Sequence, residues 1–281
     1  ATCSAKGGGS PEHTQVPKKI LFITSFAKSH TWTKNIISGL EQYLDRADYP
    51  VDVSVLELGV LRTPNGKPIA GAYEKAMDIV RQKKPDIVAV CDMPAIELFE
   101  GHYTDELKDI PVVLCGFPSG IEFSHEKYPN SAVVMQQVDI LGNVELALKL
   151  FPRTSEIAVV TDSTAEGQGI ERKAREQLAD FDRAEVKYIS GREYDTDDMY
   201  QTIKSMPKDS IVLFVNWKSA KPEIFQSQED IVKTIGEYAG CPIFTTSDLD
   251  SPQVFGGIVS RGILQGESVA RAVNSILIGA S

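Results

Sequence analysis

Polar and aromatic side chains gather at turns where an apolar, β-branched run gives way to a helical pattern. These turns span residues 24–33, 91–95, 115–118, 161–164, 216–218 and 246–248. Hydroxyl groups and free backbone N–H groups at helix starts bind a carboxylate, and aromatic rings wall an apolar or aromatic group. The residues that we predict to bind a small ligand are Ser25, Phe26, His30, Trp32, Asp92, Met93, Phe117, Asp162, Ser163, Thr164, Asn216, Trp217 and Asp248.

Each of these residue types also has a purely structural explanation. Ser, Thr and Asp are preferred N-caps, and each cap contributes about 1 kcal/mol of helix stability. Asp162 and Asp248 fit either the binding of an amine or a turn. Trp32 and Trp217 fit either a ligand wall or core packing, and His30 fits either ligand contact or simple exposure. The alternatives stay open for each residue taken alone.

No catalytic motif accompanies these turns. The sequence has no G-x-S-x-G elbow, no H-E-x-x-H, no Walker A loop and no G-x-G-x-x-G after a strand. His13, His102 and His125 lie in scattered loops without metal-ligand spacing, and no histidine is predicted near Cys91 or Cys115 to serve as a base. We therefore predict that the chain is not an enzyme and holds neither a metal ion nor a cofactor.

Short apolar runs alternate with helical patterns from Lys18 onward. A first series predicts strands over 20–24, 51–56, 86–90, 112–115 and 132–135, with helices over 32–45, 70–83 and 94–100. A second series predicts strands over 157–161, 185–189, 211–215 and 242–245, with helices over 139–150, 166–178, 197–204, 229–238 and 262–277. Two such series imply an α/β fold with two doubly wound parallel-sheet lobes. Ligands bind outside the carboxyl ends of parallel strands, which is where the turns lie.

Composition restricts the partners. The net charge is −10 and the pI about 5.0, which disfavours nucleic acid and an anionic membrane surface. The apolar runs are strand-sized, well short of the roughly 18–20 residues that cross a bilayer. No signal-peptide pattern is present, which fits either a cytoplasmic protein or a mature exported one.

The four cysteines form no C-x-x-C pair. Cys91, Cys115 and Cys241 stand at or beside predicted strand ends and are interpreted as small buried hydrophobic residues, with one disulfide between two of them as the alternative. Cys3 stands in a polar, Gly/Ser-rich leader, as the lipid-bearing cysteine of a mature bacterial lipoprotein does. A cloning remnant or chance explains its position equally well.

The first turn carries a family resemblance. Ser25-Phe26, His30-Thr31-Trp32-Thr33 and the following Ile36-x-x-Gly39-Leu40 resemble the opening of ABC-transporter substrate-binding-like proteins and of related extracytoplasmic sensor domains of bacterial signalling proteins. Further matches are Lys84-Pro85-Asp86-Ile87-Val88, Cys115-Gly116, Leu148-x-Leu150-Phe151-Pro152 and Gly256-Gly257 with Gly262-x-x-x-Gly266-Glu267. The chain departs from the sensor pattern at Ala27-Lys28-Ser29, where a proline and an aromatic residue are common.

The resemblance implies a type I periplasmic-binding-protein fold whose two lobes are joined by a hinge and close on a small solute. It also implies three crossings between lobes, with the last helix returning to the first lobe. We therefore expect a flexible N-terminal tether over 1–17, lobe 1 over 18–137 and 252–281, and lobe 2 over 138–251. Some members of the transporter group bind aromatic amino acids, which agrees with the aromatic residues of the turns.

The expected function is that of a bacterial extracytoplasmic solute-binding receptor, periplasmic or a cell-surface lipoprotein. It would deliver a small molecule, an amino acid, an aromatic compound or another compact carboxylate, to the permease of an ABC importer. One alternative is the ligand-sensing ectodomain of a histidine kinase or similar receptor, which has a signalling transmembrane module as its partner. A further alternative is an enzyme on the same scaffold. A lipid on Cys3 would be the only membrane attachment.

Overall fold

The computed structural model describes residues 16–60, 68–102, 107–118, 123–124, 126, 128–220, 224–249 and 251–279. The predicted tether lies outside these residues except for its last two positions, and so do Cys3, His13 and His125. No helix within the described ranges combines the length and the apolar character needed to cross a bilayer.

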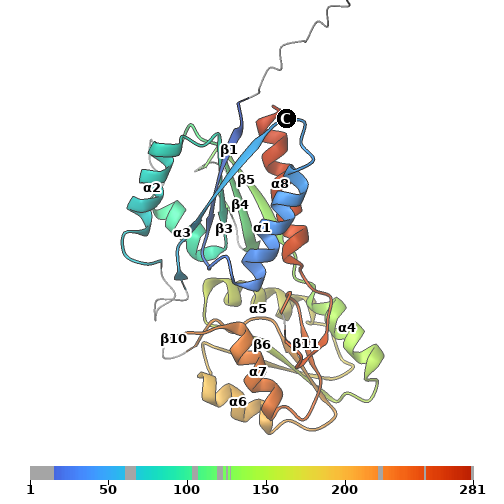
Figure 1. Cartoon of the computed structure of the whole chain (residues 1–281). Helices are drawn as coiled ribbons and strands as arrows, with labels where there is room; N and C mark the ends of the chain where they lie inside the picture. The colour runs from blue at the N-terminus through green and yellow to red at the C-terminus, as the bar shows by residue number, and fades with distance from the viewer. Residues whose placement is uncertain are drawn as a thin grey trace, which may run out of the picture.

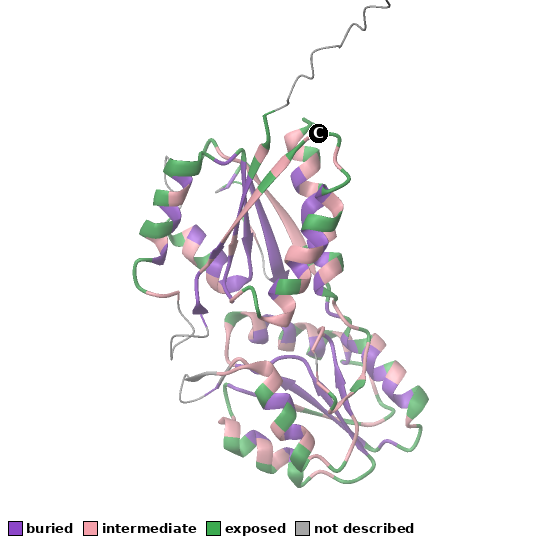
Figure 2. Cartoon of the chain, viewed as in Figure 1, coloured by how far each residue is buried: buried purple, intermediate pink, exposed green. Residues whose placement is uncertain are grey.

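The first lobe is built on a parallel five-stranded sheet in the order β2-β1-β3-β4-β5. The strands are β1 (Lys18–Thr24), β2 (Val51–Glu57), β3 (Ile87–Cys91), β4 (Val112–Pro118) and β5 (Ser131–Gln136). Every residue of β3 is buried, because helices cover both faces of the sheet (Figure 2). This explains why β3 is a continuous apolar run rather than an alternating one.

Two helices pack on each face of this sheet (Figure 1). One face is covered by α1 (Thr31–Leu44) and α8 (Gly262–Leu277), the other by α2 (Ala72–Lys83) and α3 (Met93–Gly101). Alternate residues of β1 enter the two cores. Ile20 and Phe22 face α1 and α8, whereas Leu21 lies in the core beneath α2 and α3.

The second lobe repeats this architecture. Its parallel sheet has the order β12-β11-β8-β6-β7. The strands are β6 (Glu156–Thr161), β7 (Glu185–Ser190), β8 (Ser210–Phe214), β11 (Ile243–Thr245) and β12 (Val254–Gly256). One face packs on α4 (Ile140–Leu150) and α5 (Ala165–Gln177), the other on α6 (Thr196–Lys204) and α7 (Gln228–Tyr238). Between β8 and α7 the chain forms a short antiparallel pair, β9 (Ser219–Ala220) with β10 (Ile224–Phe225).

The connection between the lobes differs from the expectation in two respects. The prediction of three crossings is wrong, because the described elements cross twice, between β5 and α4 and again between β12 and α8. A chain that begins and ends in the same lobe must cross an even number of times. The predicted return at residue 252 also falls too early. Strand β12 pairs with β11, so the chain still belongs to the sheet of lobe 2 as far as Gly256.

The three described cysteines are free thiols. Cys91 and Cys115 are register partners on β3 and β4 and are fully buried, while Cys241 is partly exposed. Burial raises the pKa of Cys91 well above its usual value, and it raises the pKa of Cys241 to about 11. Raised values keep both thiols protonated at neutral pH, which fits the interpretation of these residues as packing groups.

The closest helix packing in lobe 1 joins α1 to α8. A Cβ on Gly39 would lie 2.0 Å from the Ile263 carbonyl oxygen, and one on Gly266 would lie 2.0 Å from the Ile36 carbonyl oxygen. Both glycines therefore allow the two backbones to approach closely. Since α8 follows the second crossing, this contact ties the end of the chain to the lobe in which it began.

We predict that Gly266→Ala lowers the free energy of unfolding by about 1–3 kcal/mol, because the added methyl group forces the helices apart. Gly101→Ala is the matched control, since a Cβ at Gly101 meets nothing within 4 Å. Chemical denaturation of the two variants measures the difference. An equal change in the free energy of unfolding for both variants would mean that α1 and α8 can move apart without loss of stability.

Candidate functional site

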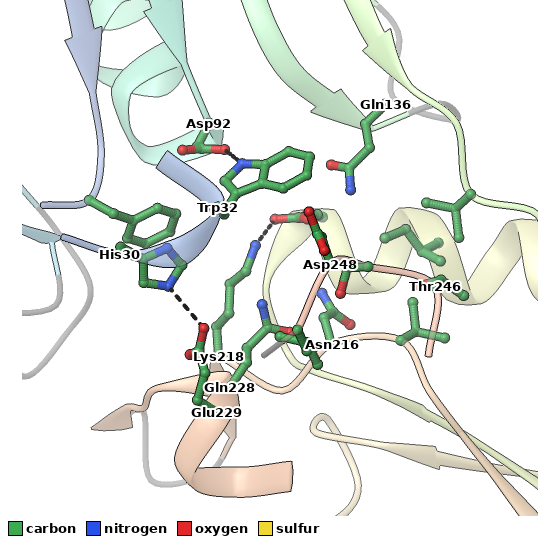
Figure 3. A pocket seen from close by; sticks show the side chains of 17 residues that line it. His30, Trp32, Asp92, Gln136, Asn216, Lys218, Gln228, Glu229, Thr246 and Asp248 are labelled. Carbon is green, nitrogen blue, oxygen red and sulfur yellow. Dashed lines mark hydrogen bonds and ion pairs between the residues drawn. The ribbon is translucent and has the colours of Figure 1, made fainter. Parts of the chain in front are cut away.

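A cavity lies between the two lobes, beside the carboxyl ends of both sheets (Figure 3). The empty space there, counted together with the open solvent at the mouth, is about 580 Å³. The predicted ligand-binding residues that line it are Phe26, His30, Trp32, Asp92, Asn216 and Asp248. The first four come from lobe 1 and the last two from lobe 2, so residues far apart in the sequence meet at one place.

On the lobe 1 side, Asp92 positions Trp32. The Trp32 Nε1–H donates to Asp92 Oδ1 over 2.9 Å (Figure 3). Asp92 has a φ of +71°, a conformation that costs a non-glycine residue roughly 1–3 kcal/mol. Its backbone N–H donates to the Cys115 carbonyl. Gly116 leaves the space for the carboxylate, because a Cβ there would lie 2.6 Å from Asp92 Oδ1.

The Asp92 carboxyl group is buried and only half satisfied. The residue is 6% exposed, and Oδ2 has no hydrogen-bond partner among the described residues. Burial raises the pKa of Asp92 to about 6, although the positive charge of Lys218 and the hydrogen bond from Trp32 oppose this shift. The fold therefore maintains both a strained backbone and a costly buried charge at the edge of the cavity.

On the lobe 2 side, a lysine is surrounded by carboxylates. Lys218 Nζ donates to Glu166 Oε2 over 2.5 Å, and the Lys218 backbone N–H donates to Asp162 Oδ2 over 2.8 Å. Burial alone would lower the pKa of Lys218, but Glu166, Asp162 and Asp92 together raise it above the usual value. The ammonium is thus charged at neutral pH and already has a counter-ion.

Contacts across the cavity join the lobes directly. Asn35 Nδ2 in α1 donates to Asp248 Oδ2 in lobe 2 over 3.0 Å. His30 Nε2 lies 3.8 Å from Glu229 Oε1 at the start of α7. Burial lowers the pKa of His30 despite the nearby Glu229 carboxylate, so the imidazole is neutral at pH 7 and this contact is not a full ion pair.

The remaining predicted ligand residues do not line the cavity. Met93 and Phe117 belong to the lobe 1 core. Ser25 Oγ accepts from the Ala95 N–H in the first turn of α3, and Thr164 Oγ1 accepts from the Gly167 N–H in the first turn of α5. Thr164 is the N-cap of α5, the structural alternative that the sequence left open, whereas Ser25 binds the start of a helix that lies 70 residues away in the sequence.

Asp162, Ser163 and Trp217 also lie outside the cavity lining. Asp162 is fully buried and accepts hydrogen bonds from Thr164 and from the Lys218 backbone, which makes it the anchor of the turn. Ser163 is partly exposed beside it. Trp217 is 0% exposed within the lobe 2 core and donates to Thr196 Oγ1. Its placement is that of a packing residue rather than a wall of the cavity.

Several polar lining residues were missed in the sequence. They are Gln136, Glu166, Lys218, Gln228, Glu229, Thr246 and Ser247. Lys218 and Thr246 stand inside turns that the sequence marked, one residue from Trp217 and two from Asp248. Gln136 ends β5, whereas Glu166, Gln228 and Glu229 open helices. Treating every polar residue in the first helical turn as a candidate would have found the last three.

Comparison with solved structures identifies the fold. One match is an ABC domain in complex with L-Trp from Streptococcus pneumonia, at 14% identity and a TM-score of 0.65, covering 94% of this chain and 86% of that chain. Another is the ligand-free, open structure of a substrate binding protein with adhesive properties from Clostridium difficile, at 16% identity and a TM-score of 0.63, covering 94% and 86%. A third is the XylFII–LytSN complex, at 13% identity and a TM-score of 0.57, covering 95% of both chains.

Comparison with protein-family models finds no match, and neither does comparison with curated protein sequences. The structural matches confirm the type I periplasmic-binding-protein fold and the α/β class with two parallel five-stranded sheets. The structural neighbours of the chain include solute-binding proteins of ABC transporters, in agreement with the resemblance of its first turn. At such low identity the likeness extends to the fold alone.

We predict that Asp92→Asn stabilises the protein at pH 7.5. The folded-state pKa of Asp92 is raised above its unfolded value, so ionisation of Asp92 destabilises the fold as pH rises through about 6. The neutral amide still accepts from Trp32, and the gain is roughly 1–3 kcal/mol at pH 7.5. Melting temperatures of both proteins at pH 7.5 and pH 5 test this. The advantage of the variant must shrink at pH 5, and a constant difference would refute the assignment.

Proposed function

We propose that this chain is an extracytoplasmic solute-binding receptor that closes on a small molecule and hands it to an ABC importer. The observation that carries the proposal is a set of buried polar atoms without partners among the described residues. They are Asp92 Oδ2 and His30 Nδ1 from lobe 1 and Asn216 Nδ2, Gln228 Oε1 and Ser247 Oγ from lobe 2, and all five residues line the same cavity. An unpartnered buried polar group costs about 1–3 kcal/mol, a cost that a bound ligand removes.

The neighbours support the proposal by analogy of fold. Two of them are named as a substrate binding protein and as a domain bound to L-Trp. We further propose that the solute leaves chemically unchanged. Mass spectrometry of the ligand before and after incubation tests this point.

A ligand-sensing ectodomain is the second candidate, and one observation favours it. A neighbour of the same fold was solved as the XylFII–LytSN complex, in which two proteins associate. In that case closure would be transmitted to a signalling transmembrane module instead of a permease. Crosslinking in cells distinguishes the two, because it recovers either a permease or a signalling receptor with the closed protein.

A thermal-shift screen of amino acids, amines, nucleosides and small carboxylates tests the receptor proposal. A ligand that binds only the folded state raises stability by RT ln(1 + [L]/Kd), about 2.7 kcal/mol at one hundred times Kd. A shift produced by one chemical class supports the receptor. Absence of any shift at millimolar concentrations, with no co-purified ligand released by denaturation, would contradict it.

The two tryptophans provide a matched pair. We predict that Trp32→Ala weakens ligand binding with a small effect on the melting temperature, because Trp32 lines the cavity. Trp217→Ala should lower the free energy of unfolding by about 3–5 kcal/mol, because it empties part of the lobe 2 core. Calorimetric titration and thermal melts of both variants measure the contrast. The reverse pattern would exclude Trp32 from the site.

Closure of the lobes should be visible in solution. We predict that ligand reduces the radius of gyration measured by X-ray scattering. Asn35→Ala should increase that radius in the ligand-free protein, because it removes the bond between Asn35 and Asp248 across the cavity. Gln42→Ala, on the exposed side of α1, is the control. A radius that responds neither to ligand nor to Asn35→Ala would argue for a rigid pair of lobes.

A further inference from the structure

The charged groups around the cavity are predominantly acidic. Among the described lining residues, the carboxylates of Asp92, Glu166, Glu229 and Asp248 face the single ammonium of Lys218. Because the pKa of His30 is lowered, the imidazole adds no charge at pH 7. Four carboxylates against one ammonium leave a formal charge of −3 in a largely enclosed space, where electrostatic interactions are stronger than in water.

The unpartnered atoms also include acceptors that need a donor. Asp92 Oδ2 and Gln228 Oε1 are buried and receive no hydrogen bond from the described residues. Asp92 is more than nine-tenths buried, so solvent does not supply the missing donor. A protonated amine carries several N–H donors and no acceptor, and it neutralises charge as well as satisfying acceptors.

We infer that the cavity binds a small organic cation, a molecule with a protonated amine and no compensating carboxylate, and that Asp248 is the specificity-determining carboxylate. This inference rests on the proposed function and specifies its ligand class. Asp248 Oδ2 is held by Asn35 from the opposite lobe, which leaves Oδ1 for the ligand. Asp248 and Asn216 come from lobe 2, whereas Trp32 and Gln136 come from lobe 1 (Figure 3).

The charged group that would attract a carboxylate is already paired. Lys218 is paired with Glu166. The N-termini of the two lobe 2 helices beside the cavity each have a side-chain cap, Thr164 for α5 and Ser227 for α7. The N-terminus of α1 has no side-chain cap, but a helix dipole supplies only about half a positive charge. The acidic groups therefore outweigh it.

The aromatic lining favours an organic cation over a metal ion. The Trp32 indole is fixed in the cavity by its hydrogen bond to Asp92, and Phe26 stacks on the His30 ring with 4.9 Å between centroids. The Phe26 face already lies 6.0 Å from the Lys218 ammonium. Aromatic faces attract cations and cover apolar stems, so an amine on a hydrocarbon body fits both parts of the lining.

The test is a calorimetric titration of the purified protein with two matched series. The first is 2-phenylethylamine, phenylalanine and 3-phenylpropanoate, and the second is 1,4-diaminobutane, 4-aminobutanoate and succinate. Within each series the size is similar and the charge runs from positive through zero to negative. We expect the amine of at least one series to bind roughly 10-fold or more tightly than its zwitterion, as one added charged contact allows.

Asp248→Asn should weaken binding of that amine roughly 10-fold and leave Tm nearly unchanged. Glu229→Gln tests a second lining carboxylate should the first variant fold poorly. Asp78→Asn is the control, since it removes an exposed carboxylate of α2. Amine binding should also weaken as salt is added, since salt screens the attraction between opposite charges.

The outcomes separate this inference from the receptor proposal. A zwitterion or a carboxylate that binds more tightly than its amine overturns the inference and supports the receptor. Failure of every amine to bind at millimolar concentration also overturns it, while the broader screen decides whether another solute binds. An amine whose affinity is equal in Asp248→Asn, Glu229→Gln and Asp78→Asn would refute the carboxylate assignment.

Discussion

Parallel pairing is the constraint on which the rest of this structure depends. A sheet that is covered by helices on both faces holds few polar side chains along its central strands, so these residues concentrate in the turns at the strand ends. In lobe 1 the first turn of α1 carries Trp32 and the turn after β3 carries Asp92, and in lobe 2 the turn after β8 carries Asn216. Because the two sheets meet with these ends facing each other, the turns form one cavity.

On the lobe 1 side of the cavity, Asp92 has several features that lower the stability of the fold. Asp92 combines a positive φ, a buried carboxyl group with a raised pKa and one unpartnered oxygen. Such features persist only where the surrounding structure enforces them. Here Trp32 binds one oxygen, the Cys115 carbonyl fixes the backbone and Gly116 leaves room for the side chain. In return for this loss of stability, Asp92 orients the Trp32 ring and contributes a negative charge to the cavity.

On the lobe 2 side of the cavity, the charged groups argue against the negatively charged ligand that the sequence suggested. Free N–H groups at helix starts suggested a carboxylate, but Thr164 and Ser227 cap their own helices. Lys218, the one described cation that lines the cavity, is neutralised by Glu166. Electrostatics therefore favours a positively charged solute, and both lobes must contribute to it, because Asp92 and Asp248 lie on opposite lobes.

The sequence by itself determined the local structure and the class of fold. Its apolar runs and helical periods place most strands and helices within two or three residues of those observed. A strand that is buried on both faces is a continuous run of apolar residues, which is recognisable in the sequence. It missed β12 and the β9–β10 pair, whose runs of two or three residues are too short for a pattern. Only the tertiary structure decided that Trp32 lines the cavity while Trp217 fills a core, since both follow strands in the sequence. The direction of a side chain at a strand end depends on which helix packs above it, and local sequence does not encode that packing.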